Sequence, residues 1–300
     1  MPSLEAAAAG PHALVGVATA PPRRAGRGRR EAPNAVAEFA RSRDLPLARP
    51  ERARDPDFVA WLRDLAPDLA VVVSYGHLLP KEVLEAPRFG CVNVHASLLP
   101  RWRGASPIQA ALLAGDAETG VTIQRMVEAL DAGPVLAAAA TPIGRDEDAA
   151  ELAPRLARLG GELLEGFLAG LDASGPPPGE PQDESRVTVC RKVKPADAVL
   201  DWARPAAEVA RHVRAYAGWP VARTTLPGGE PLLVHRGEVA EDASAAAEPG
   251  AVLAAADDFV VACGEGAYRI QVAQRPGRAV LPADAFLRGA RLAPGEVLGR

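Results

Sequence analysis

Two side chains suited to proton transfer and anion binding, His95 and Asn93, occur together in residues 91–95 (CVNVH). Successive side chains of a strand point to opposite faces, so Asn93 and His95 share one face and Val92 and Val94 the other. A strand buried on both faces is apolar at every position. An amide and an imidazole here therefore indicate a site that could stabilise an oxyanion and move a proton.

The chain leaves the sheet directly after His95. Pro100 has no backbone donor and restricts Leu99 to extended geometry, so the segment from Leu98 to Pro100 cannot continue a ladder. In an open α/β sheet, ligands usually bind at this exit. On spacing alone the alternative stays open that Asn93 and His95 only satisfy local hydrogen bonds.

Helices and apolar strands alternate through the first half of the chain, which is typical of a parallel α/β sheet. The patterns predict helices at 3–9, 35–43, 57–65, 106–114 and 147–171, and strands at 13–19, 45–48, 69–73, 91–95, 119–127 and 135–139. The turn at 128–133 carries a carboxylate, Asp131.

The composition changes at residues 175–181 (GPPPGEP), which read as a linker. Beyond it we expect helices at 205–215 and 282–288, and short strands at 221–226, 232–239, 251–255, 259–263 and 268–272. Such strands predict a small OB-like β-barrel, a fold often used for oligonucleotides. The expected organisation is an α/β domain at 1–174, a linker at 175–190 and a barrel at 191–300.

Composition excludes several classes of protein. A net charge of −4 over 300 residues gives no global attraction to nucleic acid, so any such contact must come from a local patch. The three cysteines are widely separated, which favours neither disulfides nor zinc and fits a reducing cytoplasm. No apolar run is long enough for a membrane span, and no signal peptide is apparent.

One local basic patch exists, at residues 21–30 (PPRRAGRGRR), where Pro and Gly predict an irregular loop. Its arginines could form an arm that contacts a phosphate backbone, or a solvated loop in a chain that generally uses Arg in place of Lys. The residues alone leave both interpretations open.

Several separated motifs, taken together and in order, resemble the formyltetrahydrofolate-dependent formyltransferases over nearly the whole chain. The main ones are 93–95 (NVH) with 97–100 (SLLP), 101–104 (RWRG), 120–122 (GVT) and 130–133 (LDAG). Further matches are 25–28 (AGRG), 75–76 (YG), 79–80 (LP), 107–109 (PIQ), 200–202 (LDW) and 219–220 (WP).

The resemblance implies a Rossmann-like catalytic domain and a barrel-like domain that helps to hold tRNA. It implies transfer of a formyl group from 10-formyltetrahydrofolate to the α-amino group of methionyl initiator tRNA, for translation initiation, without a metal. The catalytic residues would be Asn93, His95 and Asp131. The folate site would include Ser97, Leu98, Leu99, Pro100, Tyr75 and Gly76, and the tRNA arm would consist of Arg23, Arg24, Arg27, Arg29 and Arg30.

The chemistry implied by the resemblance explains these residue types. Attack of the amine on the formyl carbon gives a tetrahedral intermediate with a negative oxygen, to which Asn93 would donate a hydrogen bond worth roughly 3 kcal/mol. His95 would remove or relay the amine proton, or stabilise the oxyanion when protonated. Asp131 would orient the ring, raise its basicity and help to move a proton toward the leaving nitrogen.

The chain departs from the family at its start. Members begin with a strand and a Gly-Thr-Pro-like loop ahead of the first helix, and here that strand is lacking, which predicts unpaired neighbours in the sheet and low stability and activity. Alternative functions are formyl transfer to a ribonucleotide amine or an amino sugar, hydrolysis of formyltetrahydrofolate, or tRNA binding without activity. We expect a cytoplasmic monomer.

Overall fold

The protein is described here by a computed structural model that covers residues 1–22, 24–25, 30–31, 34–76, 78–241 and 247–299. It divides into two compact units, each with its own sheet. The first comprises residues 1–107, 118–142 and 154–190, and the second comprises residues 108–117, 143–153 and 191–300. No helix in the described ranges is long and apolar enough to cross a membrane.

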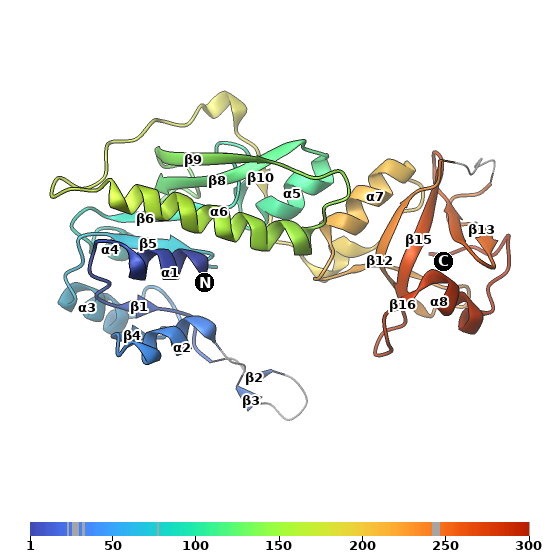
Figure 1. Cartoon of the computed structure of the whole chain (residues 1–300), viewed down its shortest axis with the longest axis horizontal. Coiled ribbons are helices and arrows are strands. Elements are labelled where there is room, and N and C mark those ends of the chain that lie inside the picture. Colours follow the sequence, from blue (N-terminus) through green and yellow to red (C-terminus); the bar gives the residue numbers. More distant parts are fainter. Residues whose placement is uncertain (23, 26–29, 32–33, 77, 242–246, 300) are drawn as a thin grey trace. The chain divides into compact units, whose positions relative to one another are not determined.

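The main sheet of the first unit has the strand order β5-β6-β8-β9 (Figure 1). Its strands are β5 (Ala70–Val73), β6 (Cys91–His95), β8 (Glu118–Arg125) and β9 (Val135–Pro142). Strand β6 has the predicted bounds and runs parallel to β5, with Asn93 opposite Val72. A second parallel pair is formed by β1 (Val17–Ala18) and β4 (Leu47–Ala48). Within the described residues, β5 pairs only with β6 and β1 only with β4; the expected loss of a family strand stays a prediction.

The predicted Rossmann-like fold class is confirmed, although the sheet is mixed. Strand β8 is antiparallel to both β6 and β9. The nine residues between β8 and β9 are too few for the crossover that a parallel connection needs, so these strands form a hairpin. Its turn contains Asp131.

The helices of this unit fix which face of β6 is accessible. They are α1 (Pro2–Ala9), α2 (Ala35–Ser42), α3 (Pro56–Asp64), α4 (Lys81–Leu84) and α6 (Ala149–Ala169, in this unit from residue 154 onward) (Figure 1). A Cβ built on Gly160 of α6 would lie 3.1 Å from Val94 Cγ1 and 3.4 Å from Val121 Cγ1. The apolar face of β6 is thus buried under α6, which leaves Asn93 and His95 on the opposite face.

The segment expected to be a linker is hydrogen-bonded along the first unit. Glu180 and Val135 exchange two backbone hydrogen bonds of 2.8 Å, which extend the hairpin by one bridge. Further on, β10 (Val189–Cys190) pairs in parallel with β7 (Arg103–Gly104). A one-turn helix, η1 (Glu184–Arg186), lies between these contacts.

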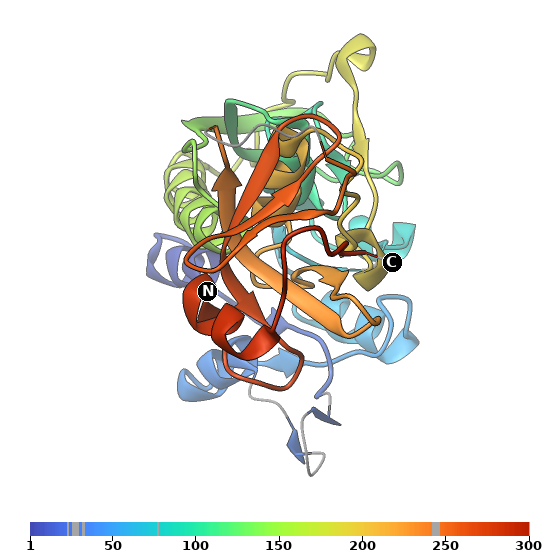
Figure 2. The ribbon, with the colours of Figure 1, turned by 90° about the vertical axis from the view of Figure 1, so that its right-hand side faces the viewer.

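The second unit contains an antiparallel sheet, drawn in orange to red in Figure 2. Its strand order is β11-β12-β15-β14-β13, and β16 also pairs with β15. This confirms the antiparallel domain predicted for the second half of the chain. Its elements are α5 (Pro107–Ala114, all but the first residue in this unit), η2 (Pro195–Ala198), α7 (Ala206–Ala215), β11 (Ala222–Thr225), β12 (Pro231–Val239), β13 (Val252–Ala255), β14 (Phe259–Ala262), β15 (Ala267–Gln274), β16 (Leu281–Pro282) and α8 (Ala283–Ala290).

The core of the second unit is aromatic at its centre. Phe259 of β14 stacks on Phe286 of α8 with a centroid distance of 6.1 Å, and the side chains of Tyr268 and Ile270 are almost completely buried beside them. Alternation of large apolar and polar residues along β12 and β15 places one face of each strand in this core.

The arginine-rich segment is not wholly irregular. Residues Arg24–Ala25 (β2) and Arg30–Glu31 (β3) form a short antiparallel ladder, so the prediction of a loop at 21–30 is wrong at residues 24, 25 and 30. Pro and Gly signals predicted an irregular loop and could not show that residues on its two sides pair. Arg23, Arg27 and Arg29 lie outside the described residues, as do the side chains of Arg24 and Arg30.

Candidate active site

The structure brings together the three residues expected to be catalytic. Asp131 Oδ1 accepts a hydrogen bond from Asn93 Nδ2 at 3.3 Å, and Asp131 Oδ2 lies 3.7 Å from His95 Nδ1. Only 6% of the His95 side chain and 10% of the Asp131 side chain are exposed. The two-residue period of β6 aims Asn93 and His95 to one side, and the hairpin turn supplies the carboxylate that meets them.

The imidazole of His95 is held by its second nitrogen. His95 Nε2 lies 2.9 Å from the backbone oxygen of Trp102, which can only accept, so Nε2 carries a hydrogen. Nδ1 then faces the Asp131 carboxylate across a gap longer than a hydrogen bond. Both neighbours of the ring are hydrogen-bond acceptors.

Asp131 is the most heavily bonded residue of the site. Its Oδ1 also accepts from Gln124 Nε2 at 2.8 Å, and its Oδ2 accepts from the backbone N–H of Gly104 at 2.8 Å. The backbone of Asp131 is left-handed, with φ at 49°. Two residues later, a Cβ on Gly133 would lie 1.7 Å from the Arg125 carbonyl oxygen, so only glycine fits where the turn rejoins the sheet.

Three contributors to the site were not predicted as functional residues. Gln124 is 1% exposed and lies directly opposite Asn93 in the β6–β8 register. The other two act through the backbone: the N–H of Gly104 and the carbonyl of Trp102, whose φ is 62°. An amide inside the apolar strand 119–127 was a usable signal for Gln124, whereas side-chain types carry no signal for backbone groups.

The predicted folate segment folds across the end of β6. Ser97 is 1% exposed and its hydroxyl donates to the Arg101 carbonyl at 2.6 Å, so it acts within the loop. Thr122 Oγ1 donates to the Ser97 carbonyl at 2.7 Å and accepts from the Leu99 N–H at 3.1 Å. Leu98, Leu99 and Pro100 are half-buried, and Leu98 covers Gly120 of β8, where a Cβ would lie 2.6 Å from Leu98 Cδ2.

Tyr75 and Gly76, also predicted for the folate site, follow the carboxyl end of β5, the strand beside β6. Burial raises the pKa of the Tyr75 hydroxyl, and the nearby charge of Asp55 raises it further. The ring is half-buried and Gly76 is exposed. Among the described residues, no group of three or more His, Cys, Asp or Glu side chains is placed to hold a metal ion.

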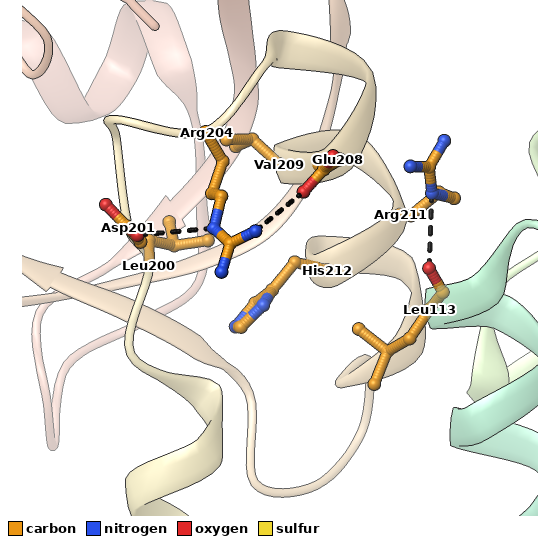
Figure 3. A pocket seen from close by; sticks show the side chains of 8 residues that line it. All are labelled: Leu113, Leu200, Asp201, Arg204, Glu208, Val209, Arg211 and His212. Atoms are coloured by element: carbon orange, nitrogen blue, oxygen red, sulfur yellow. Dashed lines mark hydrogen bonds and ion pairs between the residues drawn. The ribbon is translucent and has the colours of Figure 1, made fainter. Parts of the chain in front are cut away.

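A pocket of about 460 Å³ is lined by other residues, all of the second unit, beside α7 (Figure 3). Arg204 in its wall forms ion pairs with Asp201 at 3.4 Å and Glu208 at 3.5 Å, and Arg211 Nε donates to the Leu113 carbonyl at 3.2 Å. Because Arg204 is balanced by two carboxylates, the pocket presents little net positive charge for a phosphate.

Comparisons with known proteins match the whole chain. The sequence model described as formyl transferase matches residues 3–167, and that described as formyl transferase, C-terminal domain, matches residues 192–291. A methionyl-tRNA formyltransferase of Methylococcus capsulatus is 48% identical, with 100% of this chain and 96% of the relative aligned. One of Parvibaculum lavamentivorans is 46% identical, with 99% and 95% aligned.

Solved structures share the fold at lower identity. HypX of Aquifex aeolicus in complex with tetrahydrofolic acid has a TM-score of 0.59 and 22% identity over 86% of this chain; the match spans 45% of HypX. A methionyl-tRNA formyltransferase of Clostridium thermocellum has a TM-score of 0.52 and 18% identity, covering 69% of this chain and 88% of that protein.

Proposed function

Because this chain belongs to the formyl transferase family, we propose that Asn93, His95 and Asp131 catalyse transfer of the formyl group of 10-formyltetrahydrofolate to the α-amino group of methionyl initiator tRNA. The observation that carries the proposal is the convergence of these three side chains on one another. It occurs in a chain whose relatives, aligned from end to end, are methionyl-tRNA formyltransferases. The reaction would take place in the cytoplasm, on a monomer, at the start of translation.

His95 is the proton acceptor in this proposal. Since Nε2 is occupied by its bond to Trp102, the amine proton goes to Nδ1. The imidazolium that forms then lies against the Asp131 carboxylate, whose charge stabilises it. It returns the proton to the folate nitrogen as the bond between that nitrogen and the formyl carbon breaks. Asp131 also keeps the ring oriented, as a carboxylate does for a catalytic histidine in other enzymes.

Asn93 is the donor to the developing oxyanion. Its amide nitrogen has two hydrogens, and one is directed to Asp131 Oδ1. The second is available for the formyl oxygen. Because the first bond fixes the orientation of the amide before the substrates bind, little reorganisation is needed during the reaction.

The residues beside this trio suit a folate. A flat heterocycle needs an apolar wall and a few fixed polar groups. The segment from Leu98 to Pro100 offers the wall, Ser97 shapes it from within, and Tyr75 with Gly76 lies beyond the end of the neighbouring strand. Bound there, the folate would supply the formyl group.

We assign tRNA recognition to two regions, following the sequence analysis. The first is the segment with Arg23, Arg24, Arg27, Arg29 and Arg30, whose charge suits phosphate contacts. The second is the C-terminal domain, residues 191–300, joined to the catalytic domain 1–174 by residues 175–190. An antiparallel sheet of short strands is a common platform for nucleic acids.

A single assay tests the function. The purified chain is incubated with 10-formyltetrahydrofolate and methionyl initiator tRNA, and formyl-methionine is released from the tRNA and measured. Parallel reactions offer a charged elongator tRNA and an amino-sugar nucleotide. We expect formyl-methionine only with the initiator tRNA; formylation of the amino sugar instead, or of none of the three, would overturn the proposal.

A further inference from the structure

Residues 180–190, which connect the strands of the two sheets along the chain, contact the candidate active site. Gln182 Nε2 donates to the backbone oxygens of Asp131 and Gly133, each at 2.8 Å. The same nitrogen lies 3.4 Å from Gln124 Oε1, and Gln124 in turn donates to the Asp131 carboxylate. One side chain from outside the sheet therefore contacts two backbone carbonyls of the turn that presents Asp131.

Gln182 is itself held in place. Its Oε1 accepts from Arg103 Nε at 2.9 Å. The guanidinium of Arg103 is buried and also forms two hydrogen bonds with Glu184, at 2.8 and 3.3 Å. A planar guanidinium bound on both of its edges fixes the direction of its partners.

The backbone that follows Gln182 makes further contacts with the active-site loop. Gly104, which donates to the Asp131 carboxylate, pairs with Cys190 in the β7–β10 ladder, and a Cβ on Gly104 would lie 2.1 Å from the Cys190 carbonyl oxygen. Trp102, whose carbonyl holds His95, donates its N–H to Thr188 Oγ1 at 2.8 Å. Residues 182–190 thus support the backbone partners of both His95 and Asp131.

We propose that Gln182 is a positioning residue for Asp131: it holds the left-handed turn at 131–133 so that the carboxylate faces His95 and Asn93. The proposal rests on the catalytic role assigned to Asp131 and names a determinant outside the sheet. A left-handed φ at a non-glycine residue persists only when its surroundings impose it, and Gln182 supplies a donor to each of two carbonyls of the turn.

The test is a mutant cycle. Gln182→Met keeps the length of the side chain and removes both donors, and Gln109→Met, at a half-buried glutamine of α5, is the matched control. We expect Gln182→Met to lower kcat by about 10- to 100-fold, the scale of a catalytic group displaced by about 1 Å. The KM values for both substrates should stay within about 2-fold of wild type, and the control should match wild type.

The cycle is completed in an Asp131→Asn background. A residue that acts only through the Asp131 carboxylate has little left to contribute there, so the added effect of Gln182→Met should shrink to less than about 3-fold. Should Gln182→Met not fold, Gln182→Glu, which retains length and shape, takes its place in both backgrounds with the same expectations.

Two results would overturn the inference. One is a kcat of the Gln182 variant within about 2-fold of wild type. The other is an undiminished effect in the Asp131→Asn background, which would make Gln182 a general support of the fold. Failure of the proposed function is distinguishable, because the wild-type chain would then form no formyl-methionine at all.

Discussion

Replacement of Asp131 by asparagine separates the charge of the carboxylate from its shape. Asp131 Oδ2 lies 3.7 Å from His95 Nδ1, and in an effective dielectric of about 20 a pair of unit charges at this distance interacts by about 4 kcal/mol. This attraction develops only when His95 takes up the amine proton, so its loss acts on the transition state. The full value corresponds to about 1,000-fold in rate. Since the asparagine oxygen retains part of the interaction, we expect kcat to fall by about 100- to 1,000-fold.

The same substitution disturbs hydrogen bonding. The carboxylate accepts from Asn93, Gln124 and Gly104, whereas an amide has one acceptor oxygen and a donor that must face one of these three donors. Leaving one buried donor unpaired costs about 1–3 kcal/mol of unfolding free energy. Thermal unfolding followed by circular dichroism should therefore show a lower melting temperature for Asp131→Asn.

The kinetic measurement is single-turnover formylation of methionyl initiator tRNA with saturating 10-formyltetrahydrofolate, at a temperature where the variant is folded. Asp64→Asn, at an exposed position at the end of α3, controls for the substitution itself and should match wild type. If Asp131→Asn turned over within about 10-fold of wild type, Asp131 would have no electrostatic role in the reaction.

Four further outcomes follow from the same structure. His95→Ala should lower turnover by about 100-fold or more with the fold intact by circular dichroism; near-normal turnover would remove His95 from the mechanism. Removing Arg27 and Arg29 together should weaken tRNA binding and flatten its salt dependence while formyltetrahydrofolate binding is unchanged, and a tRNA affinity equal to that of wild type at both low and high salt would refute this. Tyr268→Phe should raise the melting temperature, because the buried Tyr268 hydroxyl meets no hydrogen-bond partner among the described residues; a fall would show that it is satisfied. Burial raises the pKa of the Cys91 thiol to about 12, so at pH 8 it stays protonated and should react with a disulfide reagent only after denaturation, whereas fast labelling of the native protein would contradict its burial.

The local sequence pattern was sufficient to predict part of the candidate active site. The period-two alternation at 91–95 placed Asn93 and His95 on one face, and β6 has those bounds. Pro100 correctly marked the place where the chain leaves the sheet. These features depend on neighbours a few residues apart, and the geometry of a strand converts such neighbours directly into positions in space.

The placement of Asp131 could not be worked out from its own neighbourhood. It meets Asn93 across 38 positions of sequence, because β8 and β9 add to the sheet as an antiparallel hairpin while the helix–strand alternation favoured parallel strands. Family resemblance supplied the trio, and periodicity supplied only two of its members. Register between strands is set by how whole faces pack.

The sequence by itself determined the two kinds of domain, the strand that carries Asn93 and His95, and the chemistry those side chains can perform. Only the tertiary structure decided that residues 180–190 contact the active site. Gln182 donates a hydrogen bond to the backbone of the Asp131 turn, Glu180 extends the hairpin, and the N–H of Gly104 donates to the Asp131 carboxylate. Proline and glycine at 175–181 mark a break in regular structure, but they do not say what the following chain binds. The hydrogen-bond partners of residues 180–190 are mostly backbone carbonyls and N–H groups, which nearly every residue carries. These partners can therefore be identified only when the fold brings them together.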